Sequence, residues 1–364
     1  MRFTISLLVF GLLLMPLGVA HANNGKGKGN GNANNNGVHT AGNGQSPNAN
    51  SNSTKTNNSW RRVWAKGGID PASFPVIDDD LLFAVIQTDW QIGRSKAHRY
   101  ATGRGIRVAV LDGGFDADHP ALMGRMEPGY NCITNDFYAS DLGNGRDDDG
   151  DGVIDNAVGH GNFVAGQILW AAPDAIIVPI CVRDDEGWGT TDELMRGLLV
   201  AMWMGVDVVN LSLSEEAANA HHILNILDMM KDQGIAIVVS AGNEGEDRIS
   251  ELAMRRTALA VSAVDRTGRL ADFSNYSTFG DPLLICAPGV DLYGPMMHGA
   301  SGYWSGTSFA AGIVSGGVAL LKQRHPDWQP EQIFEHLRAT ATQARDEHGR
   351  PIQAGLINLM WAVR

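Results

Sequence analysis

Cysteine is scarce in this sequence: Cys132, Cys181 and Cys286 are the three thiols among 364 residues. So few thiols do not predict the disulfide framework that holds many small secreted domains together. Cys181 and Cys286 lie in apolar stretches, where a cysteine usually behaves as a small buried hydrophobic residue. The fold is therefore expected to depend on a hydrophobic core, and the C-terminal region of about 275 residues is long enough to bury one.

Positive charge is also in deficit, because 28 Lys and Arg residues face 40 Asp and Glu residues and the formal net charge is -12. This balance argues against nucleic acid or an anionic membrane as a partner. Long apolar runs are absent after the first 22 residues, so no later segment is predicted to span a bilayer or to anchor the chain in a membrane. We expect a soluble monomer.

The N-terminus has the pattern of an export signal. Met1 and Arg2 precede an apolar run over 3–19, and Ala20-His-Ala22 supplies small residues for cleavage. This order predicts a signal peptide over 1–22 and a secreted protein, either extracellular or periplasmic. No cysteine follows the cleavage position as a lipid attachment point.

The next two segments differ in composition. Residues 23–58 are rich in asparagine and glycine and poor in large apolar side chains, so they predict a disordered tail. Residues 59–87 include Trp60, Trp64 and Phe74, which are apolar enough to dock on a folded domain. We interpret 59–87 as a short pro-like or linker segment and 88–364 as the main domain.

The main domain alternates apolar runs with helical stretches, which predicts an α/β fold with a mainly parallel sheet and right-handed crossovers. Helix boundaries are marked as well. Thr190 and Glu193 form a capping-box pattern, Gly205 and Gly234 are stop signals, and Pro330 opens a helix. The apolar runs are 106–111, 176–182, 206–213, 235–239 and 258–264.

Ser308 lies between a glycine-containing turn and a run of small residues that predicts a buried helix. A helix that begins there would direct unpaired N–H groups and its positive dipole end at any charge that develops beside the serine. That environment suits an oxyanion, so Ser308 is a candidate nucleophile. The alternative is an ordinary helix N-cap, for which serine is common.

Two further residues occupy positions that favour catalysis. Asp112 ends the apolar run 106–111, and sites in open α/β sheets form at the carboxyl ends of strands. His160 is flanked by Gly159 and Gly161 at a loop-to-helix junction. Each residue alone has a structural alternative, since Asp112 could form a turn and His160 could cap a helix.

The chain order Asp112, His160, Ser308 is that of subtilisin. Segments 111–114, 159–166 and 305–311 resemble the three blocks around the triad of the subtilisin family, the subtilases, and segment 239–245 resembles the loop of its oxyanion asparagine. The resemblance implies a three-layer subtilisin-like fold. It also implies that Ser308 attacks, His160 transfers the proton, Asp112 orients the imidazole and Asn243 binds the oxyanion.

The differences from the family pattern do not remove any of these four residues. Asn162 and Phe163 stand where subtilases often carry threonine and a second histidine, and Gly312 stands where proline is usual. The edge segments 185–190 and 211–215 resemble those that pair with an extended peptide in this family, which implies protein or peptide substrates. Ordinary strand-to-loop transitions are the alternative. The predicted substrate-binding residues are Gly187, Trp188, Gly189, Ser212, Leu213 and Ser214.

An acidic loop over 144–156 supplies a second chemical signal. Its alternating carboxylates and the glycine at 152 match the opening half of an EF-hand loop. Val158 occupies the twelfth position, where a bidentate glutamate is usual, and a solvated turn is the alternative. We predict a structural calcium ion as cofactor, bound by Asp147, Asp149, Asp151, Val153 and Asp155.

Together these features predict a secreted serine endopeptidase that acts through an acyl-enzyme intermediate. The alternative is a secreted binding protein that keeps the subtilase fold without catalysis, because a fold alone does not establish activity. An α/β-hydrolase esterase is disfavoured because its triad follows the order serine, acid, histidine.

Overall fold

The computed structural model describes residues 87–364 except 141–142, 149, 151, 156, 214–216, 254–255, 279–282 and 347. The predicted signal peptide, the asparagine-rich tail and nearly all of the predicted pro-like segment lie outside the described residues. Their boundaries therefore remain predictions.

A seven-stranded sheet forms the centre of the described domain, with strand order β2-β3-β1-β4-β5-β6-β7. All of its neighbouring strands pair in parallel. The strands are β1 (Arg107–Asp112), β2 (Tyr130–Asn131), β3 (Ile176–Cys181), β4 (Val208–Leu211), β5 (Ala236–Ser240), β6 (Leu259–Val264) and β7 (Leu284–Pro288). The predicted α/β fold with a mainly parallel sheet is confirmed.

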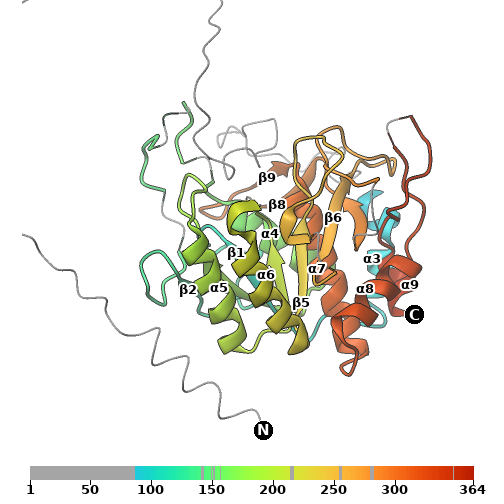
Figure 1. Cartoon of the computed structure of the whole chain (residues 1–364), viewed down its shortest axis with the longest axis horizontal. Coiled ribbons are helices and arrows are strands. Elements are labelled where there is room, and N and C mark those ends of the chain that lie inside the picture. Colours follow the sequence, from blue (N-terminus) through green and yellow to red (C-terminus); the bar gives the residue numbers. More distant parts are fainter. Residues whose placement is uncertain are drawn as a thin grey trace, which may run out of the picture. The chain divides into compact units, whose positions relative to one another are not determined.

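Helices cover both faces of this sheet and complete the predicted three layers (Figure 1). α5 (Thr191–Met204) and α6 (Ala217–Asp232) pack on one face, whereas α4 (His160–Ala171) and α7 (Thr307–Arg324) pack on the other. Because both faces are covered, positions along β1 and β3 to β6 are buried without alternation. Among the described residues, no helix has the length and apolar character needed to cross a membrane.

The remaining elements lie around these layers. They are α3 (Arg94–Ala97), the 3₁₀ helix η2 (Glu251–Ala253), the antiparallel hairpin β8 (Leu292–Pro295) and β9 (Ser301–Trp304), α8 (Pro330–Ala339) and α9 (Leu359–Val363). The predicted helix signals are confirmed. Thr190 and Glu193 form a reciprocal capping box before α5, Gly205 ends it in the left-handed region at φ 69°, and Pro330 opens α8.

Close packing of α4 against α7 determines where the site is built. A Cβ added at Gly316 would lie 2.5 Å from Ala171 Cβ and 2.8 Å from the carbonyl oxygen of Ile168. The two helices can approach this closely because α7 presents glycine to α4 at this position. His160 is the first residue of α4 and Ser308 the second of α7, so this contact brings the N-terminal ends of the helices together.

Candidate active site

Asp112 ends β1 and is fully buried. Its Oδ1 accepts a hydrogen bond from the backbone N–H of Gly113 at 2.7 Å. Burial alone would raise the pKa of this carboxyl group, but Arg183 and His160 outweigh burial and hold the pKa well below its ordinary range. Asp112 is therefore a buried carboxylate whose charge is balanced by its neighbours.

His160 lies beside Asp112, as the sequence predicts. Its Nδ1 is 2.9 Å from Oδ2 and 3.1 Å from Oδ1 of the carboxylate. Gly159 turns the chain into α4 with φ 86°, a left-handed conformation that favours glycine. The imidazole also packs on Trp304 and Phe309, whose ring centroids lie 5.6 and 5.2 Å away. Contact with Asp112 and the aromatic rings therefore fixes the position of the imidazole.

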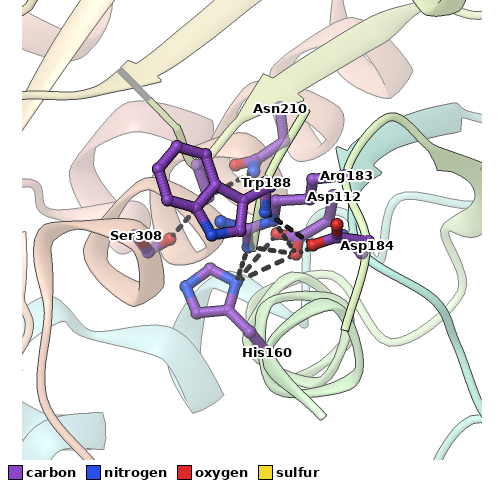
Figure 2. A network of polar contacts seen from close by, with 9 residues as sticks. Asp112, His160, Arg183, Asp184, Trp188, Asn210 and Ser308 are labelled. Atoms are coloured by element: carbon purple, nitrogen blue, oxygen red, sulfur yellow. Dashed lines mark hydrogen bonds and ion pairs between the residues drawn. The ribbon is translucent and has the colours of Figure 1, made fainter. Parts of the chain in front are cut away.

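Ser308 is buried at the start of α7 and is held through its backbone (Figure 2). Ser212 Oγ donates to the Ser308 carbonyl oxygen at 2.9 Å, and Asn210 Nδ2 donates to Ser212 Oγ at 2.8 Å. Ser315 Oγ in turn donates to Asn210 Oδ1 at 2.9 Å. The Oγ of Ser308 has no hydrogen-bond partner within the described part of the chain. The structure thus brings the three predicted residues together without a bond between Ser308 Oγ and His160.

Asn243 follows β5 and contacts the residue before Ser308. Its Oδ1 accepts from the backbone N–H of Thr307 at 2.9 Å and from Thr307 Oγ1 at 2.9 Å. A backbone N–H can only donate, so the acceptor atom of the amide faces Thr307 and the amide nitrogen faces away from it. This orientation makes the side chain a hydrogen-bond donor beside the start of α7.

Arg183 is a residue of the site that the sequence analysis missed. It lies two residues beyond β3 and is only 3% exposed. Its Nε is 3.1 Å from Asp112 Oδ1, its Nη2 contacts the same oxygen, and Nη2 is 2.6 Å from His160 Nδ1. The parallel register of β1 and β3 pairs Asp112 with Cys181, so the residues that follow β3 lie beside Asp112. Knowledge of this register would have indicated Arg183.

The segment 184–189 forms a tight turn at the end of β3. Asp184 exchanges bonds with Trp188, since its N–H donates to the Trp188 carbonyl and its Oδ1 accepts the Trp188 N–H, both at 2.7 Å. Gly187 has φ 81°, and a Cβ at Gly189 would lie 2.2 Å from the carbonyl of Val182. Both predicted glycines are therefore required by the local backbone.

The other predicted substrate-binding residues follow β4. Leu213 is buried, and Ser212 uses its hydroxyl to hold Ser308 rather than to face solvent. Ser214 lies outside the described residues. Pairing of these edges with a peptide thus stays a prediction.

Three of the five predicted calcium ligands are described. Asp147 accepts the N–H groups of Gly150 and Gly152, and Asp155 accepts those of Asn144 and Gly145. Val153 is exposed. Within the described part of the chain, no group of His, Cys, Asp or Glu side chains has the arrangement of a metal site. Asp149 and Asp151 lie outside that part.

Comparisons with known proteins agree with this architecture. The model of the subtilase family matches residues 103–354. The thermophilic serine proteinase of Bacillus sp. (strain AK1) is 35% identical over 60% of this chain, which spans about half, 52%, of that relative's length. Subtilisin BL of Lederbergia lenta is 33% identical over 70% of this chain and 91% of its own.

A solved structure of a protease from Pseudoalteromonas arctica aligns with a TM-score of 0.64 and 27% identity, over 75% of this chain and 93% of its own. The family match covers most of the chain and includes Asp112, His160, Asn243 and Ser308. The chain therefore belongs to the subtilase family of subtilisin-like serine proteases.

Proposed function

We propose that this chain is a secreted serine endopeptidase that hydrolyses peptide bonds through Asp112, His160 and Ser308. The observation that carries the proposal is the 2.9 Å contact between His160 Nδ1 and Asp112 Oδ2 at the start of α4, next to a buried serine at the start of α7. In Figure 2, Ser308 and Asp112 lie on opposite sides of the imidazole. This arrangement suits a mechanism in which His160 takes a proton from Ser308 while Asp112 orients the imidazole.

In the first half of the reaction, Ser308 Oγ attacks the carbonyl carbon of the scissile peptide and its proton moves to His160 Nε2. Asp112 accepts a hydrogen bond from the Nδ1–H group, remains ionised and stabilises the imidazolium that forms. The carbonyl oxygen becomes an oxyanion that accepts hydrogen bonds from the Ser308 N–H and the Asn243 amide. The carbon–nitrogen bond then breaks, and His160 gives its proton to the leaving amine.

In the second half, His160 takes a proton from a water molecule as it attacks the acyl-enzyme ester. The ester carbon–oxygen bond then breaks, His160 returns the proton to Ser308 Oγ, and the carboxylic acid product leaves. The empty site does not need a bond between Ser308 Oγ and His160. Such bonds are often long in free enzymes and tighten when substrate binds. The unpartnered, buried Oγ of Ser308 is therefore compatible with a nucleophile that awaits a carbonyl group.

Peptide hydrolysis by the purified full chain tests this proposal. We expect Ser308→Ala to hydrolyse peptides no faster than the reaction mixture without enzyme, because no other group replaces the nucleophile. Ser305→Ala is the matched control, since within the described part of the chain its Oγ accepts the N–H of Asp291 and has no contact with Asp112 or His160 at hydrogen-bond distance. If the wild-type protein cleaves none of a broad peptide set, the alternative of a catalytically silent binding protein replaces the proposal.

A structural calcium ion in the loop 144–156 is a second proposal. Within the described part of the chain, the carboxylates do not form a metal site by themselves. Asp147 and Asp155 accept backbone N–H groups that shape the loop. The ion would thus depend on Asp149 and Asp151. A chelator is expected to lower Tm, and added calcium, but not magnesium, to restore it, since calcium accepts irregular oxygen sites. An unchanged Tm would contradict the proposal.

A further inference from the structure

Arg183 is a buried cation beside the triad that the mechanism above does not use. Its guanidinium contacts Asp112 Oδ1 through Nε and Nη2, and Nη2 is also 2.6 Å from His160 Nδ1. A charged side chain that is 3% exposed needs a compensating partner, and Asp112 supplies one. Asp112 therefore contacts two groups that are cationic or can become so, Arg183 and His160. The proposed mechanism requires only the contact with His160.

The two oxygens of Asp112 are divided between these neighbours. Oδ1 receives Nε and Nη2 of Arg183 and the N–H of Gly113. Oδ2 is the nearer oxygen to His160 Nδ1, at 2.9 Å against 3.1 Å for Oδ1. Arg183 thus engages one carboxylate oxygen and leaves the other for the imidazole.

The contact between Arg183 and His160 Nδ1 affects the protons of the imidazole. A guanidinium can only donate hydrogen bonds. A proton on Nδ1 would therefore meet an N–H of Arg183 at 2.6 Å, whereas a lone pair on Nδ1 would accept from it. The second arrangement would put the proton on Nε2 and block transfer from Ser308. Asp112 Oδ2, 2.9 Å from Nδ1, favours the first arrangement, in which Nε2 is unprotonated. An imidazolium would carry both protons and a positive charge next to the guanidinium.

We propose that Arg183 is a positioning residue that shares Asp112 with His160, keeps the imidazole neutral and extends the activity of the enzyme toward lower pH. This inference rests on the proposed function of the triad. It assigns to Arg183 no contact with substrate. Its action passes through Asp112 and His160.

The charges around His160 give the direction of the effect. Among the described residues, the charged groups that act on its imidazole are Asp112 from β1 and Arg183 after β3. From α7 it faces Ser308 and Phe309, and from β9 Trp304, which carry no charge. Burial lowers the pKa of His160, Asp112 raises it and Arg183 lowers it, and the net direction is downward. His160 therefore stays neutral at a lower pH than an ordinary histidine. In the neutral form with its proton on Nδ1, directed at Asp112 Oδ2, it is competent as a base.

The pH dependence of kcat/KM for a peptide substrate tests the inference, because its acidic limb reports the pKa of the base in the free enzyme. Removing the adjacent cation in Arg183→Met should raise that pKa and move the acidic limb upward by about one pH unit or more. Arg183→Lys retains a positive charge and should fall between Arg183→Met and the wild type.

Arg107→Met is the matched control, because Arg107 forms an ion pair with Glu127 at the opposite end of β1. We expect its acidic limb to coincide with that of the wild type. An acidic limb in Arg183→Met that stays within about 0.2 pH unit of the wild type would overturn the inference while leaving the proposed peptidase function intact.

A titration of His160 by nitrogen-15 NMR in the full chain carrying Ser308→Ala covers the case in which Arg183→Met does not fold. The expected midpoint lies below the ordinary histidine value of about 6.5. A midpoint at or above that value would refute the role of Arg183. This measurement needs no hydrolysis. A midpoint below about 6.5, in a protein whose wild type cleaves no peptide, would contradict the peptidase proposal and leave the role of Arg183 standing.

Discussion

The amide of Asn243 has one orientation available, because Thr307 donates to its oxygen through both the backbone N–H and Oγ1. The amide nitrogen lies on the side that faces away from these Thr307 donors, which is the orientation that the proposed oxyanion role requires. At this scale the function depends on which atoms of each side chain are already engaged.

Two substitutions separate the donor role of Asn243 from its structural contact. Asn243→Asp keeps an acceptor for Thr307 but replaces the N–H donors with a negative charge, whereas Asn243→Ala removes both. We expect each to lower kcat by about 10²–10³-fold or more with little change in KM, a figure that comes from subtilisin itself. Measured kcat and KM on one peptide check this.

An aspartate variant with near wild-type kcat would show that Asn243 serves only to hold Thr307. Equal losses of kcat and of folded protein would point to the same conclusion. Circular dichroism of each variant provides the control for folding.

The sequence indicated Asp112, His160 and Ser308, which the structure brings together, but it did not indicate Arg183. The difference has physical reasons. Asp112, His160 and Ser308 each lie in a short segment with its own pattern, and their order adds information. Arg183 lies outside those patterns. Its importance comes from the register that pairs β1 with β3, which places a residue 71 positions later in the chain against Asp112.

At the scale of elements, the approach of α7 to α4 determines the distance between Ser308 and His160, the proposed nucleophile and base. Gly312 and Gly316 face α4, because added Cβ atoms would lie 3.0 Å from the Val164 carbonyl and 2.5 Å from Ala171 Cβ. Phe163 and Phe309 pack against each other near the helix starts, with their rings tilted and their centroids 4.4 Å apart. The relative position of His160 and Ser308 therefore depends on how closely α4 and α7 pack.

Gly316→Ala should separate α4 from α7. We expect a loss of about 1–3 kcal/mol in the free energy of unfolding, because the added methyl group overpacks a backbone contact. Activity should fall as well, since the displacement extends to His160 and Ser308. Urea unfolding and kcat/KM, measured on the same preparations, check this.

Gly317→Ala is the matched control in the same helix. Its added Cβ would meet the ends of Leu359 and Ile357, at 2.9 and 3.0 Å, and these side chains can move. We expect a change within about 1 kcal/mol, because alanine also favours the helix. If Gly316→Ala and Gly317→Ala lower the free energy of unfolding by the same amount, the close contact of Gly316 with α4 does not explain the loss.

Strands were easier to predict than the segments around them. The apolar runs 106–111, 176–182, 235–239 and 258–264 match β1, β3, β5 and β6 within two residues at each end, because strands covered on both faces need unbroken apolar sequence. β2, β8 and β9 escaped prediction, since they are only two to four residues long. In the acidic loop, Ile154 is exposed although it is apolar, so its burial does not follow from its residue type.

At the scale of the whole molecule, the proposal that the protease is secreted depends on residues 1–22, which lie outside the described residues. Expression of the full chain in a bacterial host should yield an exported protein that begins at Asn23 or later. Leu13→Arg should retain the protein in the cell, because a charge in the apolar run opposes insertion by about 2.5–3.5 kcal/mol. N-terminal sequencing of each cell fraction checks this.

Ala33→Arg is the control for added charge, since it lies in the predicted tail beyond the cleavage position. It should be exported like the wild type. Exported protein that still begins at Met1 would contradict the predicted signal peptide.

The most direct test of the central claim, that Ser308 is the activated nucleophile of a serine protease, is to find the site of covalent modification by a fluorophosphonate. The purified full chain is treated at neutral pH, digested and mapped by mass spectrometry. The account predicts one adduct, on Ser308, that is lost in Ser308→Ala and strongly slowed in His160→Gln. An unmodified chain, or an adduct on another serine that persists in Ser308→Ala, would contradict it.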